Sequence, residues 1–308
     1  MENSPGGHIN TTIPGSQPSR RATTVALHVT VYAMLYFITA MIALPVLMWA
    51  GGRYLGIFAG GLFSAIFANW LALRIYENRS LEQVGLWVNG NSGRNLLMGI
   101  LGGAGSACLV LGPPVLARAA HFTPTPSEPF TWGTFLFVSF LLAAGSAGEE
   151  LLFRGYGFQL LLSTLGPYAT ILPVGVLFAA LHWNNPNAGW LAMVNTAGFG
   201  FLFGYAFLRS RDLWLPIGLH FGWNFTLPLF GVNLSGLRMK VAGYELSWTA
   251  GDVWSGGQYG PEASVLTTLV LLALFVFIWK APVRRQPSPL TDPPAETPVC
   301  EQPSLLQS

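Results

Sequence analysis

The sequence predicts an all-α, polytopic integral membrane protein with about eight transmembrane helices. Of the 308 residues, 52% are hydrophobic and only 9% are charged, whereas soluble domains usually carry about a quarter of charged residues. Mean hydropathy is +0.48, which excludes a water-soluble fold. The few charges are separated by apolar runs of roughly 20 residues. A helix of that length can cross about 30 Å of hydrocarbon. Because these runs lack period-two alternation, they favour helices over a barrel.

Eight apolar segments between two polar tails account for the chain. Residues 1–24 and 281–308 are rich in proline and small polar residues, so we expect disordered cytoplasmic tails around a transmembrane helical domain of residues 25–280. The apolar run from Val25 is too long for a signal peptide and is expected to be retained as the first span. The expected spans are 26–50, 54–74, 96–117, 133–164, 167–183, 188–208, 213–230 and 263–280.

The distribution of basic residues predicts the orientation in the membrane. With the amino terminus inside, eleven Lys and Arg residues fall on the cytoplasmic side and four outside, as the positive-inside rule requires. Both termini are then cytoplasmic, and residues 231–262 form an extracytoplasmic loop. A net charge of +2 provides no basic cluster for nucleic acid. Cys108 in an apolar segment and Cys300 in the tail predict neither a disulfide nor a cysteine metal site.

Ionisable side chains inside a span are costly and therefore indicate function. The sequence EELLFR in the fourth span supplies Glu149, Glu150 and Arg154. Glu150 and Arg154 are four residues apart on one helix face and can form a charge pair. Glu149, turned by about 100° around the helix, is left as the reactive carboxylate. An alternative is that all three residues form one stabilising ionic cluster.

A histidine at the end of the fifth span is expected at the same depth as Glu149. His182 closes the sequence FAALH, and Gly166-Pro167 is the expected turn before this span. Glu149 precedes Gly166 by 17 residues and His182 follows it by 16, so both lie about 24–26 Å from the turn. Glu149 and His182 can then flank one water molecule. An alternative is that His182 is an interfacial residue without a catalytic role.

The seventh span carries a second histidine together with an amide. His220 and Asn224 lie four residues apart in the sequence HFGWN and share a helix face. Hydrogen bonding between helices is the alternative explanation for this pair. We favour that explanation for Asn69 and Asn195 in other spans.

The three patterns, in this order on three spans, resemble the CPBP family of intramembrane proteases. That family groups type II CAAX prenyl endopeptidases with bacteriocin-processing and immunity proteins, and its patterns are EExxxR, FxxxH and HxxxN or HxxxD. The resemblance covers residues 133–230 well. The sequence GGQYGPEAS at 256–264 also resembles a segment of many bacterial members.

The resemblance implies an endopeptidase in which Glu149 is the general base for water and His182 is its partner. His220 and Asn224 would stabilise the oxyanion, and Glu150 with Arg154 would be a structural pair. It further implies no cofactor, a membrane-associated peptide or protein as substrate, and the inner (plasma) membrane as location. Physical chemistry agrees, because a poorly solvated carboxylate is a better base and fixed donors stabilise the charge developing on the scissile carbonyl.

Three alternatives remain at this point. Glu149, His182 and His220 offer a set that could hold catalytic zinc, although the sequence has no HExxH motif. A transporter could use the same buried residues as a proton relay, but no inverted repeat is evident. A non-proteolytic immunity or scaffold protein is the third. For a hydrolase, we expect the four site residues to meet in a hydrated cavity that is reached from the cytoplasmic side and opens between helices.

Overall fold

Helices make up most of the computed structural model, which describes residues 17–292. The structure confirms the all-α class, and each of the eight expected spans contains a helix. Short π-helical turns at Gly56–Gly60 and Leu73–Glu77 flank α2, and 3₁₀ turns lie at Leu81–Val84 and Pro261–Ala263. The helices are α1 (Gln17–Leu55), α2 (Gly61–Ala72), α3 (Gly90–Leu116), α4 (Trp132–Arg154), α5 (Tyr156–Leu165), α6 (Pro167–Leu181), α7 (Trp190–Ser210), α8 (Trp214–Leu229), α9 (Asp252–Ser255) and α10 (Val265–Lys280).

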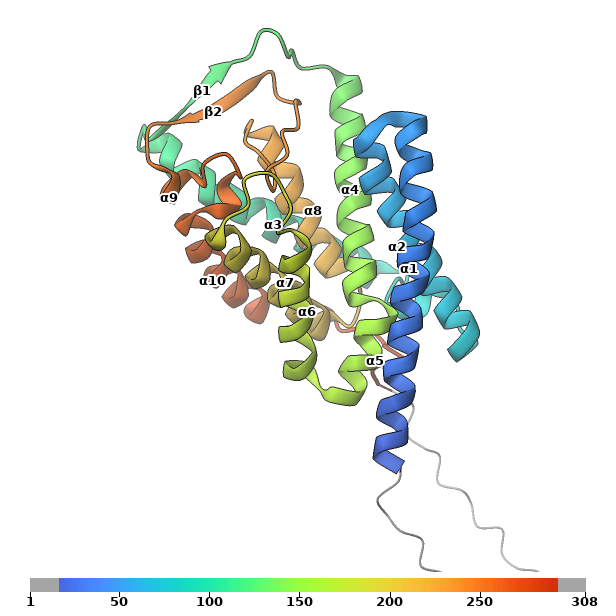
Figure 1. Cartoon of the computed structure of the whole chain (residues 1–308). Coiled ribbons are helices and arrows are strands. Elements are labelled where there is room, and N and C mark those ends of the chain that lie inside the picture. The colour runs from blue at the N-terminus through green and yellow to red at the C-terminus, as the bar shows by residue number, and fades with distance from the viewer. Residues whose placement is uncertain (1–16, 293–308) are drawn as a thin grey trace, which may run out of the picture.

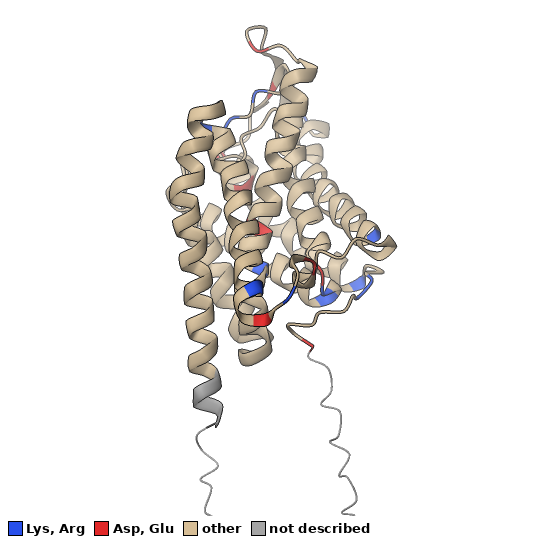
Figure 2. Ribbon diagram, turned by 90° about the vertical axis from the view of Figure 1, so that its right-hand side faces the viewer, with Lys and Arg blue, Asp and Glu red and all other residues tan. Residues whose placement is uncertain are grey.

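The surface of the bundle is that of a membrane protein. By length and composition, four helical stretches can cross a bilayer: Ala22–Glu77, Gly90–Leu116, Trp132–Leu165 and Trp190–Ser210. The first of these folds back at Gly51 and Gly52, whose φ angles of −152° and 87° interrupt the helix. Large apolar side chains such as Met41 (78% exposed) point outward. Figure 2 shows few charges along the lengths of the helices, so the bundle can face lipid with little desolvation cost.

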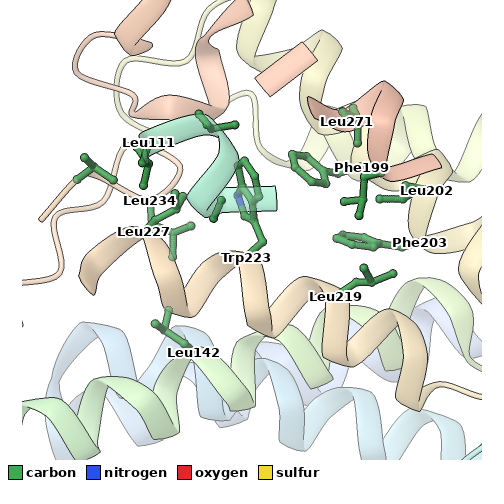
Figure 3. Packing of buried hydrophobic residues seen from close by; sticks show 14 of the residues in the cluster. Leu111, Leu142, Phe199, Leu202, Phe203, Leu219, Trp223, Leu227, Leu234 and Leu271 are labelled. Atoms are coloured by element: carbon green, nitrogen blue, oxygen red, sulfur yellow. The ribbon is translucent and has the colours of Figure 1, made fainter. Parts of the chain in front are cut away.

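The bundle has two sides that meet at α4 and α8. In Figure 1, α1, α2, α4 and α5 lie on one side, and α3, α6, α7, α8 and α10 on the other. Trp223 of α8 rises into the apolar cluster of the second side, between Leu234 and the pair Phe199 and Phe203 (Figure 3). The described ends of the chain leave the bundle at one end, and the small sheet lies at the other.

A glycine seam holds α3 against α8. A Cβ atom on Gly103 would lie 2.1 Å from the carbonyl oxygen of Leu219, and one on Gly218 would lie 2.4 Å from that of Leu96. The close approach is possible because both helices carry glycines four residues apart. In lipid, where there is no hydrophobic driving force between helices, such backbone contact is a main source of association. The seam therefore fixes α8, the helix that carries His220.

The expected fourth span is two helices instead of one. α4 ends at Arg154 and α5 begins at Tyr156, with Gly155 between them. The side-chain amide of Asn69 bridges this break: its Oδ1 accepts from the Tyr156 amide at 2.8 Å and its Nδ2 donates to the Leu151 carbonyl at 3.0 Å. A Cβ at position 155 would lie 2.2 Å from Asn69 Oδ1. Glycine is therefore required for Asn69 to satisfy the free backbone groups.

The chain after α10 is ordered, unlike the tail expected there. Gln286 is 4% exposed, and its Nε2 donates to Asp212 Oδ2 at 2.7 Å, as does Asn95 Nδ2. Burial raises the pKa of Asp212, and the hydrogen bonds from Gln286 and Asn95 oppose that rise. Residues 281–292 therefore pack on the bundle because buried donors need this acceptor. α1 likewise begins at Gln17, inside the expected tail. Residues 1–16 and 293–308 lie outside the described residues.

Three loops and a two-stranded sheet close the end of the bundle away from the chain ends. β1 (Ala120–Pro124) pairs antiparallel with β2 (Tyr244–Trp248), with Ala120 opposite Trp248. Below the sheet lie the connections after α6, after α8 and before α10, at residues 182–189, 230–237 and 256–264. The expected loop of residues 231–262 thus contains β2, α9 and the start of the 3₁₀ turn Pro261–Ala263.

We predict that Asn69→Leu destabilises the fold by about 1–3 kcal/mol, because the Tyr156 amide loses its acceptor in a buried position. Asn69 itself is fully buried. The measurement is the thermal unfolding midpoint in detergent, with Asn91→Leu at an exposed position of α3 as the matched control. Equal midpoints for the two variants would contradict the bridging role of Asn69.

Candidate active site

A fully buried ion pair lies at the end of α4. Arg154 Nη1 is 3.2 Å from Glu150 Oε2, and both side chains are 0% exposed. Arg154 Nη2 also donates to the carbonyl oxygen of Gly200 on α7 at 2.8 Å. The guanidinium lies over the rings of Phe178 and Phe203, at 5.1 and 5.4 Å from their centroids. The pair expected from the spacing of four residues is present, and it also ties α4 to α7.

The same carboxylate orients a histidine of α8. His220 Nδ1 donates to Glu150 Oε1 at 2.9 Å, and its ring stacks on Phe203 with centroids 4.8 Å apart. Its other nitrogen, Nε2, then faces Glu149 Oε2 at 3.8 Å. Since a hydrogen bond at one ring nitrogen sets the role of the other, Glu150 determines which nitrogen His220 presents to Glu149. The sequence did not predict this contact between Glu150 and His220.

The second histidine is oriented by its own helix end. His182 is the C-cap of α6, and its Nδ1 donates to the Phe178 carbonyl at 2.8 Å. Nε2 of His182 lies 3.9 Å from Glu149 Oε2. The expected meeting of Glu149 and His182 is therefore seen, although α4 and α5 are separate helices. A distance of 3.8–3.9 Å is too long for a direct hydrogen bond and is one that a bridging water can span.

Glu149 lies open to a cavity of about 250 Å³. Its side chain is 35% exposed, yet among the described residues its Oε2 atom has no hydrogen-bond partner. Asn224, one turn beyond His220 on α8, lines the same cavity. The structure thus brings together Glu149, His182, His220 and Asn224, as expected. The arrangement offers a carboxylate that can accept a proton, two imidazoles beside it and an amide donor.

The cavity does not face the end of the bundle where the chain ends lie. Its lining includes residues of the loops at the opposite end, among them Asn185, Ser235 and Glu262. Toward the chain ends it is closed, because Arg154 and Tyr156 are fully buried there. We expected access from the side of both termini, and the structure differs because the Glu150–Arg154 pair fills that space. Tyr36 and Leu181, from helices on opposite sides, also line the cavity, as expected for an opening between helices.

Sequence reasoning missed the residues that the loops contribute. Glu262 is 8% exposed and lines the cavity, although it lies outside every expected span. Asn185 and Ser235 reach the cavity from connections that have no periodic pattern. The one available signal was the sequence GGQYGPEAS, which contains Glu262 and was noted only as a resemblance.

Glu149 and the two imidazoles lie farther apart than the ligands of a zinc ion. Tetrahedral ligands at 2.0–2.1 Å from zinc lie about 3.3 Å from one another, whereas Glu149 Oε2 is 3.8 and 3.9 Å from the two imidazole nitrogens. Within the described part of the chain, no group of three His, Cys, Asp or Glu side chains is arranged to hold a metal ion. The residues present would have to move closer together to bind zinc.

Comparison with known proteins gives one family match. Residues 129–226 match the model of the Rce1-like family, described as "Type II CAAX prenyl endopeptidase Rce1-like". The match covers about a third of the chain and includes all four expected site residues. No significant match was found among curated proteins or among solved structures.

The fold and the site define a helical membrane protein with a carboxylate and two imidazoles over one internal cavity. Within that class, residues 129–226 are similar to the Rce1-like family of type II CAAX prenyl endopeptidases. The match confirms the resemblance that EELLFR, FAALH and HFGWN indicated, and the long apolar helices agree with a membrane protein.

We predict that Arg154→Ala destabilises the protein by about 3–5 kcal/mol, because Glu150 would remain buried without its cation. The measurement is the unfolding temperature in detergent, detected as the loss of soluble monomer on heating. Arg209→Ala is the control, because this arginine near the end of α7 is only partly buried and bonds a single carbonyl oxygen. If the two variants unfolded at the same temperature, the Glu150–Arg154 pair would not carry this stabilisation.

Proposed function

We propose that this chain is an intramembrane endopeptidase that hydrolyses a peptide bond with a water molecule activated by Glu149. One observation carries the proposal: the Glu149 carboxylate, open to the cavity, points a buried oxygen without a protein hydrogen bond at two imidazole nitrogens within 4 Å. A water molecule bound among these three groups would have a proton acceptor and fixed neighbours on the same side. General base catalysis needs this geometry.

The chemistry follows from the roles that these atoms can take. Glu149 accepts a proton from water while the oxygen attacks the scissile carbonyl, and a tetrahedral oxyanion forms. His182 Nε2 accepts a hydrogen bond from the water. His220, in its protonated form, and the Asn224 amide donate to the oxyanion. When the C–N bond breaks, the proton held by Glu149 passes to the leaving amine. Acid and amine products then leave, and Glu149 is again a carboxylate.

Glu150 and Arg154 support this chemistry without touching the substrate. Glu150 is the acceptor for His220 Nδ1 at 2.9 Å, so it keeps His220 Nε2 directed toward Glu149. Arg154 balances the charge of Glu150 at 3.2 Å. Without that cation, Glu150 would be a buried charge with no opposite charge beside it.

The substrate in this proposal is a membrane-associated protein or peptide that enters between helices. The cavity lies between Tyr36, Ile57 and Phe58 on one side and Leu181 with Phe199 on the other. This lining suits an apolar segment in extended form, because a regular helix hides its scissile carbonyl in hydrogen bonds. The family name supports a CAAX-type endopeptidase, and whether the substrate is prenylated is part of the test.

We predict that Glu149→Gln abolishes peptide cleavage without loss of folded protein, since the amide keeps the shape but cannot accept the proton. Purified protein in lipid vesicles is assayed with two quenched fluorescent peptides of one CAAX sequence, one farnesylated at cysteine and one unmodified. In parallel, membrane peptides from cells with wild type and with the variant are compared by mass spectrometry.

Glu245→Gln is the control, because this carboxylate is 41% exposed on β2 and pairs with Arg238 outside the cavity. Full activity of Glu149→Gln would remove Glu149 from the mechanism. A chelator arm tests the zinc alternative: activity lost with chelator and restored by zinc would replace the metal-free mechanism. Absence of any product difference between wild type and Glu149→Gln in cells and vesicles would favour a non-proteolytic immunity or scaffold protein.

We propose further that the protein lies in the inner (plasma) membrane with both termini in the cytoplasm. The proposal rests on the excess of basic residues on the side of the termini.

In a protein with Cys108 and Cys300 replaced by alanine, we predict that the cysteine of Pro287→Cys is shielded from an impermeant thiol reagent in intact cells. Cysteine at Val253, which is 58% exposed at the other end of the bundle, should react. Permeabilised cells, in which both should react, are the control. The opposite labelling pattern would invert the topology.

A further inference from the structure

A second carboxylate reaches the cavity from outside the transmembrane helices. Glu262 lies in the 3₁₀ turn Pro261–Ala263 and is 8% exposed. Its Oε2 accepts from the Ser235 hydroxyl at 2.9 Å and from the Ser235 backbone amide, and its Oε1 accepts from Trp223 Nε1 at 3.4 Å. Trp223 is the residue before Asn224 on α8, so this carboxylate contacts both α8 and the loop that follows it.

The backbone of Glu262 is held independently of its side chain. Asn195 on α7 donates from Nδ2 to the carbonyl oxygens of Glu262 at 2.8 Å and Ser264 at 3.0 Å. The Thr268 hydroxyl on α10 donates to Asn195 Oδ1 at 2.7 Å. The turn is therefore fixed to α7 and α10, and the carboxylate projects from a rigid base. Removing the charge of Glu262 would release the groups bound to the carboxylate and leave the turn in place.

The loop bound by Glu262 forms the roof of the cavity. We call residues 234–237 the roof loop; Leu234, Ser235 and Leu237 all line the cavity. The loop reverses direction with Ser235 at φ 48°. A Cβ on Gly236 would lie 2.1 Å from the Pro186 carbonyl, so the roof loop packs directly on the segment that begins at His182. The position of the roof loop thus sets the space above His182.

Glu262 also lines the same cavity as His182. The side chains that bind its carboxylate, Ser235 and Trp223, are neutral donors, so no hydrogen bond from a cation neutralises it among the described residues. Burial raises the pKa of Glu262, and the hydrogen bonds from Ser235 and the attraction of His182 oppose that rise. Glu149 and Glu262 are therefore two carboxylates that line one cavity with His182.

We propose that Glu262 is a positioning residue of the Glu149 site: its carboxylate fixes the roof loop over the cavity, above His182. The inference rests on the proposed function. It predicts an effect on turnover that exceeds any effect on folding, because Asn195 holds the turn without the carboxylate. It also predicts that both carboxylate oxygens matter, because Gln at position 262 would keep one acceptor oxygen but present an amide donor to Trp223 or Ser235, which are donors themselves.

The test compares Glu262→Gln with Glu149→Gln and Glu245→Gln in the peptide assay in vesicles described above, with kcat, KM and the unfolding midpoint measured for each. We expect Glu262→Gln to lower kcat about tenfold or more, as loss of an active-site electrostatic interaction does, with an unfolding midpoint close to wild type. Ser235→Ala, which removes one hydrogen bond and keeps the charge, should lower kcat by a smaller factor. Glu245→Gln should match wild type.

The outcomes separate this inference from the proposed function. If Glu149→Gln is inactive and Glu262→Gln has the wild-type kcat, the positioning role is wrong while the proposed function stands. If Glu149→Gln retains full activity, the proposed function falls and this inference falls with it. Should Glu262→Gln not fold, the decision passes to Ser235→Ala: a wild-type kcat for that variant overturns the inference, and a reduced kcat at an unchanged midpoint supports it.

Discussion

The arrangement of the site depends on the burial of one ion pair within a membrane protein. Charges in a low-dielectric interior are stable only when they are paired and their remaining hydrogen-bonding capacity is used. Glu150 and Arg154 meet most of this requirement with groups from three helices: each other on α4, the Gly200 carbonyl on α7 and His220 on α8. Among the described residues, Arg154 Nε is left without a hydrogen-bond partner. The need to satisfy the pair thus brings α4, α7 and α8 together. Glu149 reaches the cavity because its neighbour is fixed there.

The sequence predicted what depends on regular helix geometry. The spacing of four between Glu150 and Arg154, and between His220 and Asn224, is a property of any α-helix, so shared faces could be inferred without a structure. Glu149 and His182 are nearly the same number of residues from the turn, so a constant helix rise predicted that their side chains lie close together. These inferences held because helix rise per residue is nearly constant, even where the span itself is broken at Gly155.

Other features could not be derived from spacing. The contact of Glu150 with His220 joins residues 70 positions apart, and nothing in the local sequence selects that carboxylate over Glu149. The local sequence predicts a continuous span through Gly155. The break at this residue is favourable because Asn69, on a different helix, bonds the free backbone groups. Glu262, Ser235 and Asn185 lie in connections whose path is set by packing on neighbouring loops. The expected access side was wrong because side-chain filling near Arg154 is a tertiary property.

The seam between α3 and α8 has a consequence for residues far from the cavity. At Gly99, Gly103, Gly218 and Gly222 the two backbones leave less than 3 Å for a methyl group, so even alanine would have to push the helices apart. His220 and Asn224 lie on α8, whereas Glu149 lies on α4. The distance from Glu149 to His220 and Asn224 therefore depends on a contact between helices that lies outside the cavity lining. A larger residue at any of these four glycines would change the width of the cavity through helix spacing, with every polar group of the cavity unaltered.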